Sequence, residues 1–204
     1  PTPDTRAAVL HALFRALART TLRWFYRDVA VVGLEQVPRD GPLLVAMNHP
    51  NALVDALVAV SVLPRRVTLT AKATLWESPA LRLLLPRVGI VPLRRAQDER
   101  ARRKDAAGGA AVTAEAADGA NVRVGGAPRP SDRNASSFAA LLDALARGGA
   151  VLIFPEGISH GAPRLAPLKT GLARIGLQAR DERGVRAVRV LPVGLVFERK
   201  WQPR

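Results

Sequence analysis

The chain of 204 residues contains no cysteine, so it can form neither a disulfide framework nor a thiolate metal site. Aromatic residues make up only 4% of the sequence and hydrophobic residues 48%, which suits an aliphatic α/β interior better than an all-β one. No uninterrupted apolar stretch reaches the ~18 residues that a membrane-spanning helix requires. The length predicts one domain that is large enough to bury a hydrophobic core.

Acidic residues and lysines are also scarce. The 31 basic residues against 17 acidic ones give a net charge of +14, and only four of the basic residues are lysines. Such a surface attracts phosphate-rich partners, either nucleic acid or anionic lipid. The sequence lacks an RNP-type motif and Cys/His finger spacing, so we predict an anionic membrane surface and no nucleic acid as partner. A genomic preference for Arg and Ala codons explains the arginine excess equally well.

Residues 4–27 predict an amphipathic helix, with apolar residues on one face and an arginine at every fourth position on the other. The apolar residues are Val9, Leu10, Leu13, Phe14, Leu17, Trp24 and Phe25, and the arginines are Arg15, Arg19, Arg23 and Arg27. Such a helix is typical of those that lie in a membrane interface. Packing against its own domain explains the pattern equally well. We assign 1–28 to this helix and 29–204 to the main domain, and expect a truncated C-terminus.

Strands and helices alternate through the main domain. We predict strands at 29–33, 43–47, 67–71, 90–93, 151–154 and 188–193, with a continuation of the last to 197 as an alternative, and helices at 52–63, 78–85, 138–147 and 165–180. This order predicts an α/β fold with a mostly parallel central sheet flanked by helices. Residues 105–136 are dominated by Ala, Gly, Asp and Ser without periodicity, which predicts a disordered insertion, with a substrate lid as the alternative.

His49 and Asp55 follow the predicted strand at 43–47. A histidine there can take a proton from a hydroxyl, and a carboxylate can hold its ring and stabilise the imidazolium that forms. With Asn51 as the helix cap, Asp55 reaches back to one ring nitrogen and leaves the other free. No Ser or Cys nucleophile adjoins the pair, so the attacking hydroxyl belongs to the substrate. The structural alternative is a turn in which His49 binds backbone and Asp55 faces the helix dipole.

A second carboxylate, Glu156, ends the predicted strand at 151–154 and is followed by Gly157, which permits close approach of a ligand. Glu156 can accept a hydrogen bond from a substrate hydroxyl or orient a basic residue; the alternative is a solvated turn. Arg94 and Arg95 follow the strand at 90–93, where a guanidinium suits a phosphate, and Lys169 is a further cation. Because ligands bind at the carboxyl ends of parallel strands, we expect His49, Arg95 and Glu156, which each follow a predicted strand closely, to meet on one rim.

In order and content, these segments resemble the conserved blocks of the glycerolipid acyltransferases, which esterify glycerol 3-phosphate or lysophosphatidate. Asn48-His49 with Asp55 resembles the catalytic block, and Gly89 to Arg95 resembles the block that binds the acceptor phosphate. Phe154-Pro155-Glu156-Gly157 is similar to the third block, and Leu191-Pro192-Val193 is similar to the fourth.

The chain departs from the family pattern in two places. Five residues separate His49 from Asp55, whereas four are usual, and within one helix the extra residue would rotate Asp55 by about 100°. We expect that residue in the turn before the Asn51 cap, as in a branch of the family with this spacing. The third block commonly continues Thr-Arg-Ser, but here it continues Ile158-Ser159-His160. Lys169 or Arg94 is expected to compensate for the missing arginine.

The resemblance implies that His49, oriented by Asp55, is the general base for transfer of an acyl group from acyl-CoA or acyl-carrier protein. It implies that Arg95, Arg94 and Lys169 hold the phosphate of a glycerol phosphate or lysophospholipid acceptor, with Asn48, Glu156 and Gly157 lining the substrate site. It implies no metal and no bound cofactor. We expect a protein that associates peripherally with the cytoplasmic face of a membrane.

Two other functions fit the same residues. In a metal-dependent hydrolase, His49, Asp55 and Glu156 would be metal ligands. In a lipid-binding or scaffold domain, the fold would persist without chemistry.

Overall fold

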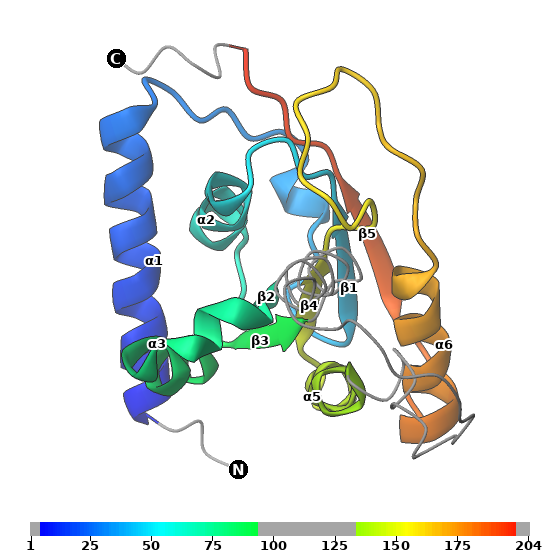
Figure 1. Cartoon of the computed structure of the whole chain (residues 1–204). Helices are drawn as coiled ribbons and strands as arrows, with labels where there is room; N and C mark the ends of the chain where they lie inside the picture. The colour runs from blue at the N-terminus through cyan, green and yellow to red at the C-terminus, as the bar shows by residue number, and fades with distance from the viewer. Residues whose placement is uncertain (1–4, 94–133, 199–204) are drawn as a thin grey trace, which may run out of the picture.

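The centre of the molecule is a five-stranded sheet with the order β3-β2-β4-β1-β5, seen in a computed structural model that describes residues 5–93 and 134–198 (Figure 1). The strands are β1 (Leu43–Met47), β2 (Val67–Lys72), β3 (Ile90–Leu93), β4 (Ala150–Ile153) and β5 (Arg189–Val193). Every neighbouring pair is parallel. The predicted α/β fold with a mostly parallel sheet is therefore confirmed.

Helices cover both faces of this sheet (Figure 1). They are α1 (Thr5–Phe25), α2 (Leu53–Val62), α3 (Pro79–Leu84), α5 (Ala135–Ala146) and α6 (Gly171–Arg183). Short 3₁₀ turns occupy Leu34–Gln36, Ala73–Glu77 and Leu85–Val88. Helix α2 lies between the sheet and α1 on one side, and α5 and α6 lie on the other.

The two central strands are apolar on both faces, because each face is covered by helices. In β1, Leu43, Val45 and Met47 belong to the core under α2, whereas Leu44 belongs to the core under α5 and α6. Strand β4 alternates in the same way between the two cores. These continuous apolar runs explain why the sequence predicted both strands closely.

Helix α1 packs on its own domain along one side only. Ala18 and Leu22 are buried, Phe14 packs on the core under α2, and Arg19 donates a hydrogen bond to the carbonyl of Ser61 over 3.0 Å. Of the residues predicted to form the apolar face, Phe14 therefore packs on the domain, whereas most of the others remain exposed. Val9, Leu13, Leu17 and Trp24 stay exposed on the outer side. Among the helices that the structure describes, none has the length and apolar character needed to cross a membrane.

Several predicted elements differ from those of the structure. Residues 29–33 form no strand, and Val32 is 98% exposed, because β5 already occupies the sheet edge beside β1. Residues 135 and 136, assigned to the insertion, belong to α5, while 94–133 lie outside the described residues. Helix α6 begins at Gly171 instead of 165, and β5 ends at Val193 without continuing to 197.

Candidate functional site

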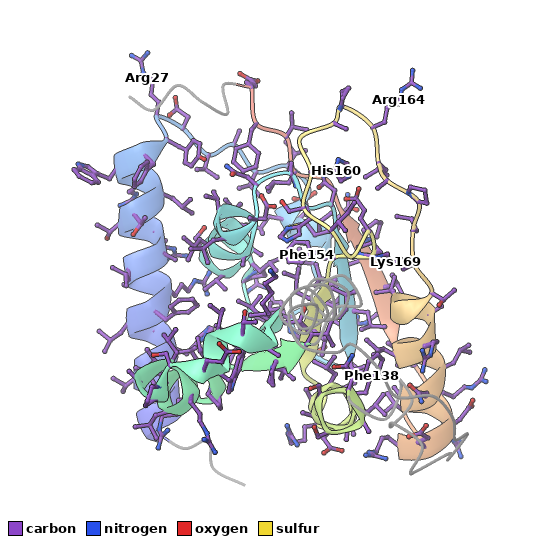
Figure 2. All side chains as sticks on the ribbon, in the orientation of Figure 1. Arg27, Phe138, Phe154, His160, Arg164 and Lys169 are labelled. Atoms are coloured by element: carbon purple, nitrogen blue, oxygen red, sulfur yellow. The ribbon has the colours of Figure 1, made fainter. Side chains whose placement is uncertain are left out.

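The site lies at the carboxyl ends of β1 and β4, which are neighbours in the sheet. This pairing places the turn after β1, residues 48–52, beside the turn after β4, residues 154–157. The loop that follows, residues 157–170, arches over the sheet, and Arg164 points outward from it (Figure 2). Two of the three groups expected on one rim, His49 and Glu156, are therefore brought together.

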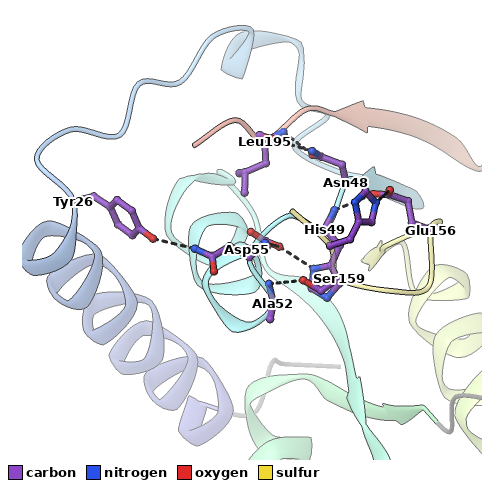
Figure 3. Close-up of polar contacts among 10 residues, drawn as sticks. Tyr26, Asn48, His49, Ala52, Asp55, Glu156, Ser159 and Leu195 are labelled. Atoms are coloured by element: carbon purple, nitrogen blue, oxygen red, sulfur yellow. Dashed lines mark hydrogen bonds and ion pairs between the residues drawn. The ribbon is translucent and has the colours of Figure 1, made fainter. Parts of the chain in front are cut away.

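The predicted contact between His49 and Asp55 is confirmed. The distance from His49 Nδ1 to Asp55 Oδ2 is 2.9 Å, and both residues are buried (Figure 3). The same Asp55 oxygen accepts the backbone N–H of Asn51 over 2.7 Å. Because the carboxylate engages Nδ1, Nε2 is the ring nitrogen that remains for a substrate proton. Helix α2 begins at Leu53, so the extra residue between His49 and Asp55 lies in the turn before the helix, although not before a cap at Asn51.

The predicted helix cap at Asn51 is wrong. Helix α2 begins at Leu53, Ala52 occupies the cap position, and no side chain caps the first turn. The Asn51 amide instead donates to the Tyr26 hydroxyl over 3.1 Å. Ala52 has φ 43° and is the one non-glycine residue with positive φ among those that the structure describes. A backbone outlier of this kind persists only where its surroundings hold it.

Glu156 is a buried carboxylate whose two oxygens accept hydrogen bonds from distant parts of the chain. Oε1 accepts the N–H of His49 over 3.1 Å, and Oε2 accepts the N–H of Ala166 over 2.7 Å as well as binding the His160 ring at Nε2. Burial acts to raise the pKa of Glu156, but the Ala166 N–H, the His160 ring and the His49 N–H outweigh it and hold that pKa below its usual value. Glu156 therefore orients a basic residue, one of its two predicted roles.

Phe154 is a site residue that the sequence analysis did not single out. Its ring stacks on the His49 ring, with the centroids 3.8 Å apart and the planes 19° apart. An aromatic face attracts a cation, so Phe154 favours the imidazolium that forms when His49 accepts a proton. Phe154 lies directly before Pro-Glu-Gly in the third block, and this position was the sequence signal that could have identified it as a site residue. No local pattern pointed to Tyr26, whose partner is 25 positions away.

Asn48 joins the turn after β1 to the segment that follows the fourth block. Its amide nitrogen donates to the Leu195 carbonyl over 2.9 Å, and its amide oxygen accepts the Leu195 N–H over 2.6 Å (Figure 3). This two-way pairing fixes the segment after β5 beside His49. Asn48 thereby contacts protein backbone at both ends of its amide.

Lys169 returns to the third block at the end of the loop. The backbone N–H of Lys169 donates to the Pro155 carbonyl over 2.8 Å. The side-chain Nζ of Lys169 lies 2.8 Å from the point that a Cβ on Gly157 would occupy. Gly157 also has φ 66°, so glycine meets both the steric and the conformational requirement here. The predicted arginines, Arg94 and Arg95, lie outside the described residues. The strand that leads to them, β3, is separated from β1 by β2 and β4.

His49, Asp55 and Glu156 do not share a common point for a metal ion. Asp55 and Glu156 contact different atoms of His49, namely Nδ1 and the backbone N–H. In the described part of the chain, no group of three His, Cys, Asp or Glu residues could hold a metal. The arrangement instead suits proton transfer by a carboxylate-oriented imidazole.

Comparisons with known proteins agree with these motifs. The family model described as Acyltransferase matches residues 28–196. The chain is 24% identical to an uncharacterized acyltransferase of Schizosaccharomyces pombe, over 85% of this chain and 34% of that protein. It is 42% identical to glycerol-3-phosphate O-acyltransferase 2 of Saccharomyces cerevisiae over 64 residues, which are 31% of this chain and 9% of that protein. The chain thus spans 34% or less of these curated relatives.

A solved structure shares the fold. The chain is similar to the crystal structure of the 1-acyl-sn-glycerophosphate (LPA) acyltransferase, PlsC, from Thermotoga maritima, with a TM-score of 0.57 and 16% sequence identity. The match covers 92% of this chain and 68% of that one. At this identity the similarity establishes the fold alone and does not establish the chemistry.

Replacing Glu156 with Gln tests its role as a buried anchor. We expect the free energy of unfolding at pH 7 to fall by about 1–3 kcal/mol, since a neutral amide offers one acceptor oxygen where the carboxylate offers two. The lowered pKa means that ionised Glu156 stabilises the wild type above the unfolded-state pKa and that this contribution is lost as the pH falls through the native value. The difference between wild type and Glu156→Gln should therefore shrink below about pH 4.5, the ordinary value for Glu. Urea unfolding between pH 7 and 3 measures this, and a difference independent of pH would contradict it.

Proposed function

Because this chain belongs to the acyltransferase family, we propose that it transfers a fatty acyl group from a thioester donor to a hydroxyl of a glycerol phosphate or lysophospholipid in phospholipid biosynthesis. The observation that carries the proposal is the buried His49–Asp55 pair at the carboxyl edge of the sheet. Two similar proteins are named for acceptors of this class, glycerol 3-phosphate and 1-acyl-sn-glycerophosphate. The donor is acyl-CoA or acyl-carrier protein.

The reaction proceeds by general-base catalysis. His49 Nε2 takes the proton of the acceptor hydroxyl as its oxygen attacks the thioester carbonyl carbon, and the tetrahedral intermediate collapses with cleavage of the C–S bond. The departing thiol sulfur takes up the proton from Nε2, so His49 returns to its neutral form. Asp55, 2.9 Å from Nδ1, holds the ring orientation and stabilises the transient imidazolium, and the stacked face of Phe154 adds to this.

The acceptor phosphate binds to the cations near the third block. Lys169 lies over Gly157, so its ammonium is close to the turn that holds Glu156. Arg94 and Arg95 come directly after β3 in the sequence, and in this proposal they complete the phosphate site. Arg95 is assigned the main phosphate contact, as the family pattern implies, because a guanidinium fork suits phosphate oxygens.

A membrane surface supplies the lipid substrates. The outer side of α1 exposes Val9, Leu13 and Leu17, and Trp24 is 79% exposed near the end of the helix. Trp24 is two residues before Tyr26, whose hydroxyl accepts a hydrogen bond from Asn51 in the turn after β1 (Figure 3). An apolar helix face with an aromatic end, on a protein of net charge +14, suits an anionic interface. We therefore propose peripheral membrane association through α1.

Removing the base or its partner tests the catalytic assignment. We expect His49→Ala and Asp55→Asn to lower kcat about 10²- to 10⁴-fold, the range for loss of a positioned general base. A labelled acyl-CoA assay with glycerol 3-phosphate, dihydroxyacetone phosphate and lysophosphatidate measures the loss and identifies the acceptor. Unchanged circular dichroism controls for folding. If His49→Ala keeps more than a tenth of the activity, His49 is not the base, and if the wild type consumes no donor, the scaffold function replaces the enzyme.

Removing the cations tests the phosphate site. We expect Arg95→Ala and Lys169→Ala each to raise the KM for the phosphorylated acceptor about tenfold while the KM for the acyl donor stays unchanged. Arg180→Ala is the matched control, since Arg180 is an exposed arginine of α6 that pairs with Asp181. An unchanged acceptor KM in either variant refutes the role assigned to that residue.

Charging the outer side of α1 tests membrane association. We expect the double variant Leu13→Glu, Leu17→Glu to weaken binding to phosphatidylglycerol vesicles at least tenfold, because each buried leucine contributes about 1.5–3 kcal/mol. Co-sedimentation with vesicles measures the bound fraction. Leu177→Glu is the control, because Leu177 is an exposed leucine of α6 on the opposite face of the sheet. Equal binding by the double variant and the wild type would exclude α1 as the contact.

A further inference from the structure

The turn between His49 and Asp55 is held at two points by the loop after Glu156. Ser159 Oγ accepts the backbone N–H of Ala52 over 2.9 Å, and the N–H of His160 donates to the carbonyl of His49 over 3.1 Å (Figure 3). These partners are more than a hundred positions apart along the chain; Ser159 and Ala52 are separated by 107. The loop therefore contacts the turn both at the histidine and at the residue before α2.

Ala52 is the point in this turn that needs support. Its φ of 43° and ψ of −113° are values that side chains with a Cβ rarely adopt. The N–H groups of Asn51 and Ala52 are consecutive, and they are directed to Asp55 and Ser159 respectively. Rotation of the turn at Ala52 would break the Ser159 bond and move the N–H that binds Asp55. The Ser159 hydroxyl thus opposes relaxation of the backbone that carries the catalytic pair.

We propose that Ser159 is a positioning residue, whose hydroxyl holds the longer turn at Ala52 so that His49 and Asp55 stay aligned. The inference deepens the proposed function, since its kinetic part presupposes that His49 is the base. It also links the two departures from the family pattern. The longer turn presents the N–H of Ala52, and position 159 carries a hydroxyl that accepts it, where the family pattern commonly has an arginine, whose side chain has donors only.

Substitutions at position 159 separate the hydroxyl from the rest of the loop. We expect Ser159→Ala to lower kcat about five- to tenfold with both KM values within twofold of the wild type, and Ser159→Thr, which keeps an acceptor, to stay within twofold throughout. Ser136→Ala, which removes an exposed hydroxyl from α5, is the control and should leave kcat unchanged. Equal losses in Ser159→Ala and Ser159→Thr, or no loss in Ser159→Ala, would overturn the proposal.

A spectroscopic measurement tests alignment without relying on activity. In ¹⁵N-labelled protein, we expect the His49 ring in the wild type and in Ser159→Thr to carry its proton on Nδ1, facing Asp55, and the ring in Ser159→Ala to show a mixture of tautomers. If the wild type transfers no acyl group, this comparison still decides whether Ser159 aligns the pair. Identical His49 nitrogen shifts in wild type and Ser159→Ala would refute the positioning role.

The backbone of Ala52 offers a second, independent test. Glycine adopts positive φ without strain, so Ala52→Gly removes the need for support at this point. We expect Ser159→Ala to lower kcat less than twofold in the Ala52→Gly background, against five- to tenfold in the wild-type background. Additive losses in the double variant would show that Ser159 does not act through Ala52.

Discussion

The parallel pairing of β1 with β4 is the constraint on which the site depends. The register sets Ala46 beside Ile153, and a few residues further on the His49 N–H reaches Glu156 over 3.1 Å. The other Glu156 oxygen binds Ala166 and His160, so one buried carboxylate fastens the loop over the turn that carries His49. Since Glu156 is only 2% exposed, water competes little for these hydrogen bonds.

His49 and His160 each have a carboxylate partner near this edge of the sheet, but the two pairs differ in whether the second ring nitrogen remains available to a substrate. Asp55 binds Nδ1 of His49 from the first turn of α2, so the opposite nitrogen remains for a substrate proton. Glu156 binds Nε2 of His160, and the other nitrogen of that ring accepts the N–H of Ala162 over 3.3 Å. The first pair is arranged for proton transfer, and the second is arranged to shape a loop.

Local patterns predicted the buried parts of the sheet well. The strand at 43–47 was confirmed to the residue, since a strand that is covered on both faces appears as a continuous apolar run. The half-buried edge strand at 90–93 was confirmed as well. A similar apolar run at 29–33 forms no strand and leaves Val32 98% exposed, because an apolar run becomes a strand only where the fold places it beside the sheet. The start of α6 was predicted too early, because the N–H groups of Ala166 and Lys169 bind Glu156 and Pro155 instead of continuing a helix.

The sequence by itself determined the fold class, the order of the blocks and the presence of His49, Asp55 and Glu156, because periodicity and motif spacing are local properties of a chain. Only the tertiary structure decided that the added residue of the catalytic turn is accommodated at Ala52, that Ser159 accepts its N–H, and that Phe154 stacks on His49. These contacts join residues about a hundred positions apart, and their geometry follows from strand order and backbone direction, which no local pattern specifies.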